Sequence, residues 1–200
     1  MGCDIHLHIE YRLKEERTNI IREAEYDNDG NEVRKAVTWT ENTDWRKYQY
    51  RGEWSNRLYG MFAVLADVRN NWRLEHIELR GFPDDAQQFT KEEYYLRVIT
   101  DEEFKKYGDV WRNCCSVSDA LRWEGKRFMM NGCEYTEHPD WHSANWCTTD
   151  EMRNAIDTVF KNKEGIYKGD YVEWMGLLGT MEGLERTGKY ECRAVYWFDN

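Results

Sequence analysis

The chain has 200 residues and a formal net charge of -10, which argues against non-specific binding to nucleic acid, because such binding depends on clustered Lys and Arg. Hydrophobic residues make up 40% of the chain and aromatic residues 15%, so a core can form and disorder of the whole chain is excluded. The length fits one domain. Since neither a long apolar run nor a secretory signal is found, we expect a cytoplasmic protein that has no membrane partner.

The first half of the chain predicts three elements. Residues 4–11 alternate between apolar and polar side chains, which is typical of a strand with one apolar face. Residues 18–26 and 33–40 flank an Asp-Gly step and predict a β-hairpin. Residues 54–70 predict a central helix, because apolar side chains recur every three or four positions along one stripe. This stripe consists of Leu58, Met61, Phe62, Leu65 and Val68.

The second half predicts further short elements. The pairs Thr90 and Glu93, Thr100 and Glu103, and Thr148 and Glu151 have the spacing of a capping box, which predicts a helix start at each. Further elements are a short helix at 118–124, a turn at Asn131-Gly132, a helix over about 171–184 and a final strand at 190–198.

These elements predict an α+β fold. We expect a single compact domain over residues 1–200, in which an antiparallel or mixed sheet contains the first and last strands and is packed by several helices. Residues 105–138 are interpreted as an insertion within it. The six cysteines are expected to be reduced thiols, and none lies in a C-x-x-C pair that would predict a zinc site.

The first candidate site lies on the polar side of the first strand. Asp4 and His6 are two residues apart, so both side chains project from one face and could hold one metal or one ligand. The alternative is a solvated strand face that has no function, formed by Asp4, His6, His8 and Glu10.

A second candidate is the segment 138–143. Together with Asp4 and His6, its residues Asp140 and His142 would supply two carboxylates and two imidazoles, a sufficient set for a divalent metal if the fold gathers them. Ser143 follows His142 directly, and we do not expect a nucleophile and base there because neighbouring loop residues seldom point at each other.

A third candidate is the pair Arg69 and Arg80. Arginine binds phosphate or carboxylate through paired donors, and the Gly81-x-Pro83 turn after Arg80 allows close approach of a ligand to the backbone. The alternative for each arginine is a salt bridge to one of the abundant carboxylates.

Several motifs together resemble an uncharacterised family encoded by phages and prophages. They are the opening M-G-C-D-I-H, the segment from Arg57 to Arg69, Arg80-Gly81-x-Pro83, Asp140-x-His142-Ser143 and the closing W-F-D-N. The chain departs from the family pattern at Phe82 and Asn145. The resemblance implies a phage context and one ligand-binding surface, formed by Asp4, His6, Arg69, Arg80, His142, Ser143 and Asp199.

Three functions are compatible with these residues. The first is a counter-defence protein that sequesters a small phosphorylated, nucleotide-like signal in the cytoplasm of the infected or lysogenic host cell. The second is a metal-dependent, phosphodiesterase-like hydrolase that uses Asp4, His6, Asp140 and His142 as ligands. The third is an inhibitor or adaptor that binds a host protein. The sequence favours ligand binding, because no H-E-x-x-H or similar metal motif occurs; a homo-oligomer is compatible with all three.

Overall fold

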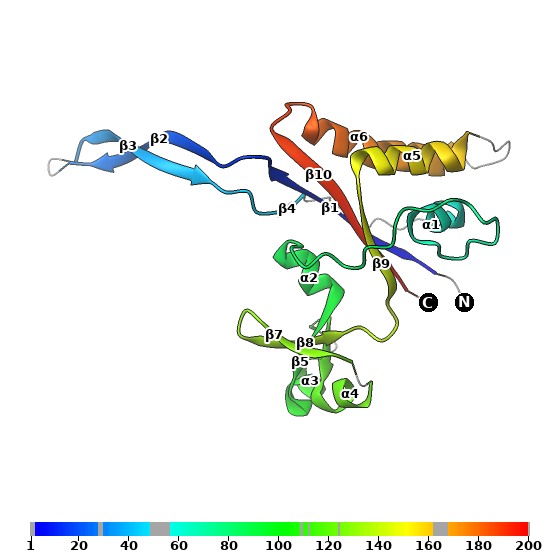
Figure 1. The fold of residues 1–200 in the computed structure, drawn as a ribbon. Helices are drawn as coiled ribbons and strands as arrows, with labels where there is room; N and C mark the ends of the chain where they lie inside the picture. The colour runs from blue at the N-terminus through cyan, green and yellow to red at the C-terminus, as the bar shows by residue number, and fades with distance from the viewer. Residues whose placement is uncertain are drawn as a thin grey trace.

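A four-stranded antiparallel sheet joins the two ends of the chain in this computed structural model, which describes residues 3–27, 30–48, 57–108, 110–111, 113–123, 125–161 and 168–199 (Figure 1). Its strand order is β4 (Arg46–Lys47), β1 (Ile5–Leu13), β10 (Tyr190–Phe198) and β9 (His142–Thr148). β1 pairs with β10 along its whole length. The predicted α+β fold with the first and last strands in one sheet is therefore confirmed. We call this the main sheet.

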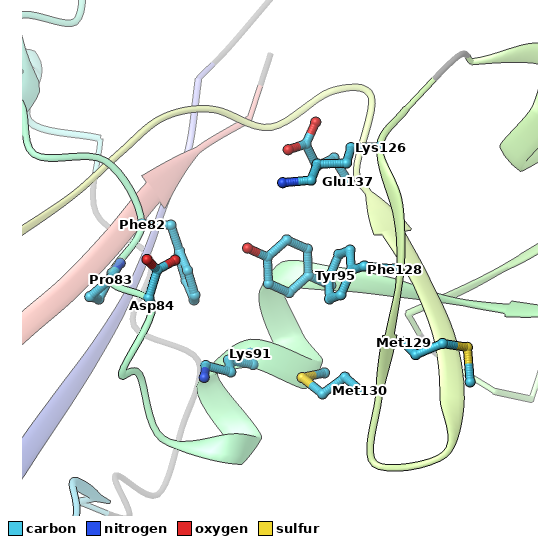
Figure 2. Close-up of a pocket in the computed structure, with 10 residues that line it drawn as sticks. All are labelled: Phe82, Pro83, Asp84, Lys91, Tyr95, Lys126, Phe128, Met129, Met130 and Glu137. Atoms are coloured by element: carbon cyan, nitrogen blue, oxygen red, sulfur yellow. The ribbon is translucent and has the colours of Figure 1, made fainter.

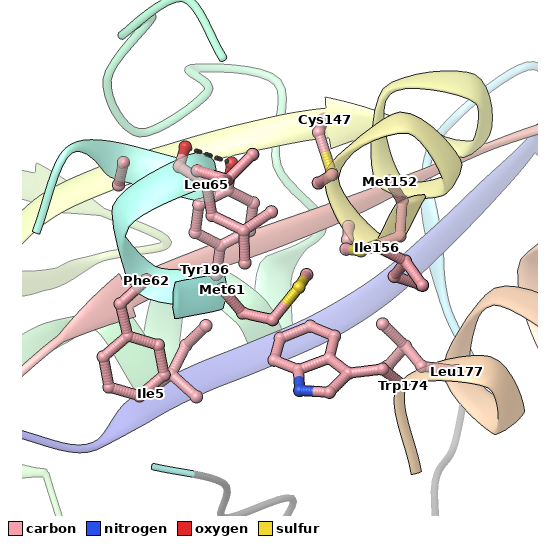
Figure 3. Close-up of a cluster of buried hydrophobic side chains, with 14 of the residues drawn as sticks. Ile5, Met61, Phe62, Leu65, Cys147, Met152, Ile156, Trp174, Leu177 and Tyr196 are labelled. Carbon is pink, nitrogen blue, oxygen red and sulfur yellow. Dashed lines mark hydrogen bonds between the residues drawn. The ribbon is translucent and has the colours of Figure 1, made fainter. Parts of the chain in front are cut away.

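Three helices cover one face of the main sheet: α1 (Tyr59–Ala66), α5 (Thr149–Phe160) and α6 (Lys168–Glu185) (Figure 1). The hydrophobic core lies between the helices and the sheet (Figure 3). It includes Ile5 from β1, Phe62 from α1, Met152 from α5 and Trp174 from α6. β10 adds Tyr196, whose hydroxyl donates a hydrogen bond of 2.9 Å to the carbonyl oxygen of Leu65 in α1. Large side chains from both ends of the chain thus fill one core. Among the described residues, no helix has the length and apolar character of a membrane span.

The central helix differs from its prediction. Residues 54–56 lie outside the described part of the chain, and α1 ends at Ala66 because Asp67 adopts a left-handed conformation, with φ of 58°. Every residue of 60–66 is buried, so α1 is apolar all round and not along one stripe. Arg69 consequently lies in the loop that follows the helix and not within it.

Two of the three predicted capping boxes are confirmed. Thr100 and Glu103 cap α3 (Asp101–Tyr107), and Thr148 and Glu151 cap α5. The box at Thr90 is wrong. The helix there, α2 (Gln88–Tyr94), is capped by Gln87, whose side chain accepts a hydrogen bond of 2.7 Å from the backbone N–H of Phe89.

The predicted hairpin is confirmed as β2 (Arg17–Tyr26) and β3 (Glu32–Glu41), which pair antiparallel from Arg17 opposite Glu41 to Tyr26 opposite Glu32. This two-stranded ribbon projects away from the main sheet (Figure 1). Its exposed apolar side chains include Ile20, Tyr26 and Val33.

A second sheet has the order β6 (Cys114–Ser116), β5 (Tyr95–Ile99), β8 (Cys133–Glu137) and β7 (Arg127–Met130), and α4 (Val117–Arg122) follows β6. It has its own small core of Leu96, Val98, Cys115 and Ala120. Asn131 and Gly132 both have positive φ, 49° and 75°, as expected of the tight turn between β7 and β8. The second sheet begins at Tyr95, before the predicted insertion 105–138, whose status as an insertion stays a prediction.

The six cysteines, all within the described residues, are free thiols, as the sequence predicts.

The packing of α6 generates a stability prediction. Met181 is fully buried, whereas Met175, on the same helix, is 38% exposed. We expect Met181→Ala to lower the free energy of unfolding by about 2–5 kcal/mol, because it removes core contacts and leaves a cavity. Met175→Ala, the matched control, should change it by less than about 1 kcal/mol. Urea unfolding followed by tryptophan fluorescence measures both, and equal losses would contradict the difference in burial between the two methionines.

Candidate functional site

The face of the main sheet opposite the helices carries charged and aromatic side chains that are largely hidden from solvent. Cross-strand pairing places His6 opposite Trp197 and Glu10 opposite Arg193. Glu10 is 0% exposed and Arg193 is 3% exposed. The interpretation of this side of β1 as a simple solvated face is therefore wrong, because other parts of the chain pack on it.

A buried ion pair holds the middle of this face together. The Arg193 guanidinium donates hydrogen bonds of 2.9 Å to Glu10 and 2.7 Å to Asp85, and it stacks 3.9 Å from the Trp45 ring centre. Burial acts to raise the pKa of Asp85, but the hydrogen bonds from Arg193 and Trp45 outweigh it and lower that pKa. With its partners supplied from within the chain, this network is structural.

An aromatic cluster lies beside the ion pair. The ring of His6 stacks on Trp197 at 5.6 Å and contacts Trp141 at 5.4 Å. His138 stacks on Trp141 at 4.3 Å, and burial lowers the pKa of His138. The imidazoles therefore serve as packed rings in this cluster.

Three predicted site residues do meet at the end of the main sheet. The backbone N–H of Asp4 donates to the Asp199 carboxylate at 2.8 Å, and His6 Nε2 lies 3.4 Å from the same carboxylate. Arg57, which was not predicted as a site residue, binds the Asp4 carboxylate through two nitrogens, one at 2.7 Å. The hydrogen bond from Arg57, the largest effect, lowers the pKa of Asp4 against its partial burial.

The predicted arginines make protein contacts instead of lining one pocket. The Arg80 guanidinium donates hydrogen bonds from two nitrogens to the Glu151 carboxylate, one of them 2.9 Å long. It also stacks over Trp146, with 4.6 Å between the guanidinium carbon and the ring centre. Arg69, whose φ is 52°, stacks 4.8 Å over the Tyr59 ring. Arg80 thus follows the alternative reading of a salt bridge, and it ties the loop before Phe82 to α5.

His142 and Ser143 lie on a different side from His6. His142 is paired with Phe198 and packs against its ring, and Phe198 belongs to the core on the helix side. His142 Nδ1 is 3.0 Å from Ser143 Oγ, so the expectation that these neighbours point apart is wrong. The surface implied by the family resemblance is gathered only in part. Arg69, Asp4 and Asp199 all lie near Cys3: burial raises the pKa of the Cys3 thiol, the two carboxylates raise it further and Arg69 acts to lower it. Arg80 instead binds Glu151, and His142 packs on Phe198.

The metal candidates are also dispersed. Within the described ranges, no group of three or more His, Cys, Asp or Glu side chains is placed to hold a metal ion. Asp140 contacts His138 through its backbone N–H, 3.2 Å from Nδ1, and its carboxylate is exposed. The proposed ligand set of Asp4, His6, Asp140 and His142 therefore does not converge.

A pocket of about 360 Å³ lies between the segment 82–84, α2 and the second sheet, and no local sequence pattern predicted it (Figure 2). Aromatic rings form its walls: Phe82 stacks on Tyr94 at 4.0 Å and meets Tyr95 at 5.5 Å, and Tyr95 packs edge-on against Phe128 at 4.7 Å. The Arg80-Gly81-x-Pro83 turn was interpreted as a place where a ligand could approach, and its residues Phe82 and Pro83, with Asp84 after them, line this pocket.

Four charged side chains also line the pocket: Lys91, Lys126, Asp84 and Glu137. None of the four forms a side-chain hydrogen bond or ion pair with a residue that the structure describes. Burial, together with neighbouring Tyr94 and the carboxylates of Glu137 and Asp84, raises the pKa of Tyr95 to about 12. The Tyr95 phenol therefore stays protonated at neutral pH and is available as a hydrogen-bond donor.

Comparisons with protein-family models, with curated proteins and with solved structures find no match to this chain.

Glu93 links α2, which carries Lys91, to the main sheet. His8 Nε2 lies 2.9 Å from the Glu93 carboxylate, and Lys47 Nζ donates to it at 2.9 Å. Burial acts to raise the pKa of Glu93, but the hydrogen bonds from His8 and Lys47 outweigh it and lower that pKa to about 2.

This depressed pKa predicts a pH-dependent contribution to stability. The ionised Glu93 stabilises the fold above its unfolded pKa of about 4.5, and the contribution is lost as pH falls toward about 2. We expect Glu93→Gln to be less stable than the parent at about pH 6, with the difference shrinking below about pH 4.5. Urea unfolding over this range measures it. Glu75→Gln, at an exposed loop position, is the control, and a constant difference for Glu93→Gln would contradict the prediction.

Proposed function

We propose that the chain binds a small phosphorylated, nucleotide-like ligand in the pocket between the segment 82–84, α2 and the second sheet. The observation that supports this is the combination of aromatic walls with two lysine ammonium groups that have no partner among the described side chains. Aromatic rings stack on a base, and ammonium groups attract phosphate. The residues differ from those predicted, but the chemical class of ligand is the same.

The size of the pocket fits a small ligand. Its volume of about 360 Å³ is near the lower end of the range of about 300–1,000 Å³ typical of small-molecule sites. Met129 and Met130 add flexible thioether side chains that adapt to the shape of a ligand. A single nucleotide unit is therefore the best match to this space.

Sequestration is the proposed mechanism. Binding alone needs no nucleophile or general base, and the pocket combines stacking surface with charge. In the phage context that the family resemblance implies, the captured molecule would be a phosphorylated signal of host immunity in the cytoplasm. Efficacy would then depend on the concentration of protein relative to the signal.

The projecting hairpin favours a second candidate function, the binding of a host protein. Ile20 is 75% exposed and Tyr26 is 73% exposed on a ribbon that stands away from the main sheet (Figure 1). Exposed apolar side chains gathered on one element mark interaction surfaces more often than isolated ones do. In that case the pocket would be incidental.

Calorimetric titration of the full chain with the common ribonucleoside 5′-monophosphates tests the proposed site. We expect one ligand per pocket, and we expect Lys91→Met to weaken binding roughly tenfold or more, because it removes a charge-assisted hydrogen bond to phosphate. Lys105→Met, at an exposed position of α3, is the matched control and should bind like the parent. Equal affinities for Lys91→Met and Lys105→Met would contradict the site.

Sequestration also predicts that the ligand survives. After prolonged incubation with protein and added Mg²⁺ or Mn²⁺, we expect chromatography with mass detection to recover the nucleotide unchanged at one equivalent per chain. Conversion to a nucleoside or to free phosphate, at amounts exceeding the protein, would favour the hydrolase.

A further inference from the structure

The ribbon formed by β2 and β3 has two open edges. Within the described part of the chain, each of these strands pairs only with the other, and the pairing runs over ten residues of each strand without a register shift. Half of the backbone N–H and C=O groups of each strand point away from the ribbon, toward a position where no described strand lies. An open edge of this length is a template for a further strand.

The ribbon lacks several of the features that keep sheet edges apart. Natural edges are often protected by proline, by a β-bulge or by a covering helix or loop. Neither strand contains proline, the pairing is continuous, and the ribbon stands away from the main sheet (Figure 1). It also leaves Ile20 75% exposed and Tyr26 73% exposed. Since an isolated two-stranded ribbon is only marginally stable in water, a further strand would stabilise this one.

The charges of the ribbon indicate a partner with the same mixed pattern. The chain as a whole carries a net charge of -10, yet β2 and β3 each contain two basic and two acidic residues and are therefore neutral. A strongly acidic or strongly basic partner gains no net attraction at such a surface. A second copy of the chain brings an equally balanced strand, and two acidic chains repel each other least where their surfaces are neutral.

We infer that β2 pairs antiparallel with β2 of a second copy, with Ile21 opposite its own counterpart at the twofold axis. In this register residues 17–25 of the two strands pair, and Arg17 lies opposite Glu25 on both sides of the axis. Opposite charges that face each other across antiparallel strands are stabilising, and no like charges face each other here. The two copies of Ile20 become diagonal neighbours on one face, which shelters part of their exposed surface.

The edge of β3 fits its own counterpart less well. A symmetric pairing of all ten residues of β3 would place Glu32 opposite Glu41 in both halves, and like charges directly opposite each other are destabilising. The two symmetric registers that pair nine residues bring no opposite charges together. The arrangement along β2 therefore gives a four-stranded sheet of order β3-β2-β2-β3 that is shared between two chains.

Analytical ultracentrifugation of the full chain tests for this dimer. We expect a concentration-dependent equilibrium between one and two chains within about 1–100 μM. Arg17→Glu and Glu25→Arg should each raise the dissociation constant roughly tenfold or more, because the twofold axis repeats each like-charge contact. Arg34→Glu, an equal change of charge at an exposed position of β3, is the matched control and should dimerise like the parent.

A mixture of the two charge variants gives a sharper test. When Arg17→Glu meets Glu25→Arg, both cross-strand contacts again join an acidic side chain to a basic one. We expect the mixture to form heterodimers with an affinity close to that of the parent, although each variant alone dimerises poorly. This recovery distinguishes lost pairing from misfolding, because two misfolded chains would not restore each other.

A parent chain that stays monomeric over this range would overturn the inference and leave the ribbon to a host protein. A dimer that neither charge variant weakens, or a mixture that shows no recovery, would overturn the pairing along β2. Neither Arg17 nor Glu25 lines the pocket, so these outcomes are independent of nucleotide binding there.

Discussion

The ion pair between Glu10 and Arg193 is the contact on which the rest of the polar face depends. It joins the first and last strands at a position with almost no solvent access, where removal of one charge alone would cost about 3–5 kcal/mol. The Glu10 carboxylate also accepts a hydrogen bond of 2.8 Å from the backbone N–H of Gln87, and Arg193 binds Asp85. The loop that enters α2 is thereby fixed to the main sheet.

This attachment positions the pocket. The segment 82–84 is anchored on both sides. Asp85, which follows it, binds Arg193. Arg80, which precedes it, donates a backbone hydrogen bond of 2.9 Å to the buried side chain of Asn145. One wall of the pocket is therefore rigidly tied to the main sheet, while the other comes from the second sheet. The helices on the far face supply the apolar core and leave this face to charges and rings.

Local patterns predicted the elements well, and non-local contacts explain the failures. The alternation in β1 and the capping box at Thr148 depend only on neighbouring residues, and both are confirmed. The box at Thr90 failed because Glu93 binds His8 and Lys47, which no local pattern reveals. The candidate site is harder still to predict, since its lining residues lie on separate elements that are joined only through the pairing of β5 with β8 and of β8 with β7.

The charge of the whole chain does not prevent a small anion from binding in the pocket. A net charge of -10 repels polyanions at long range, but at physiological salt exposed charges are screened beyond about 8 Å. Short-range contacts therefore decide which anion binds. The lysines of the pocket could attract the small anionic ligand that we propose at short range, whereas a nucleic acid would need many cations along an extended surface. The acidic charge of the chain is consequently compatible with the small anionic ligand that we propose.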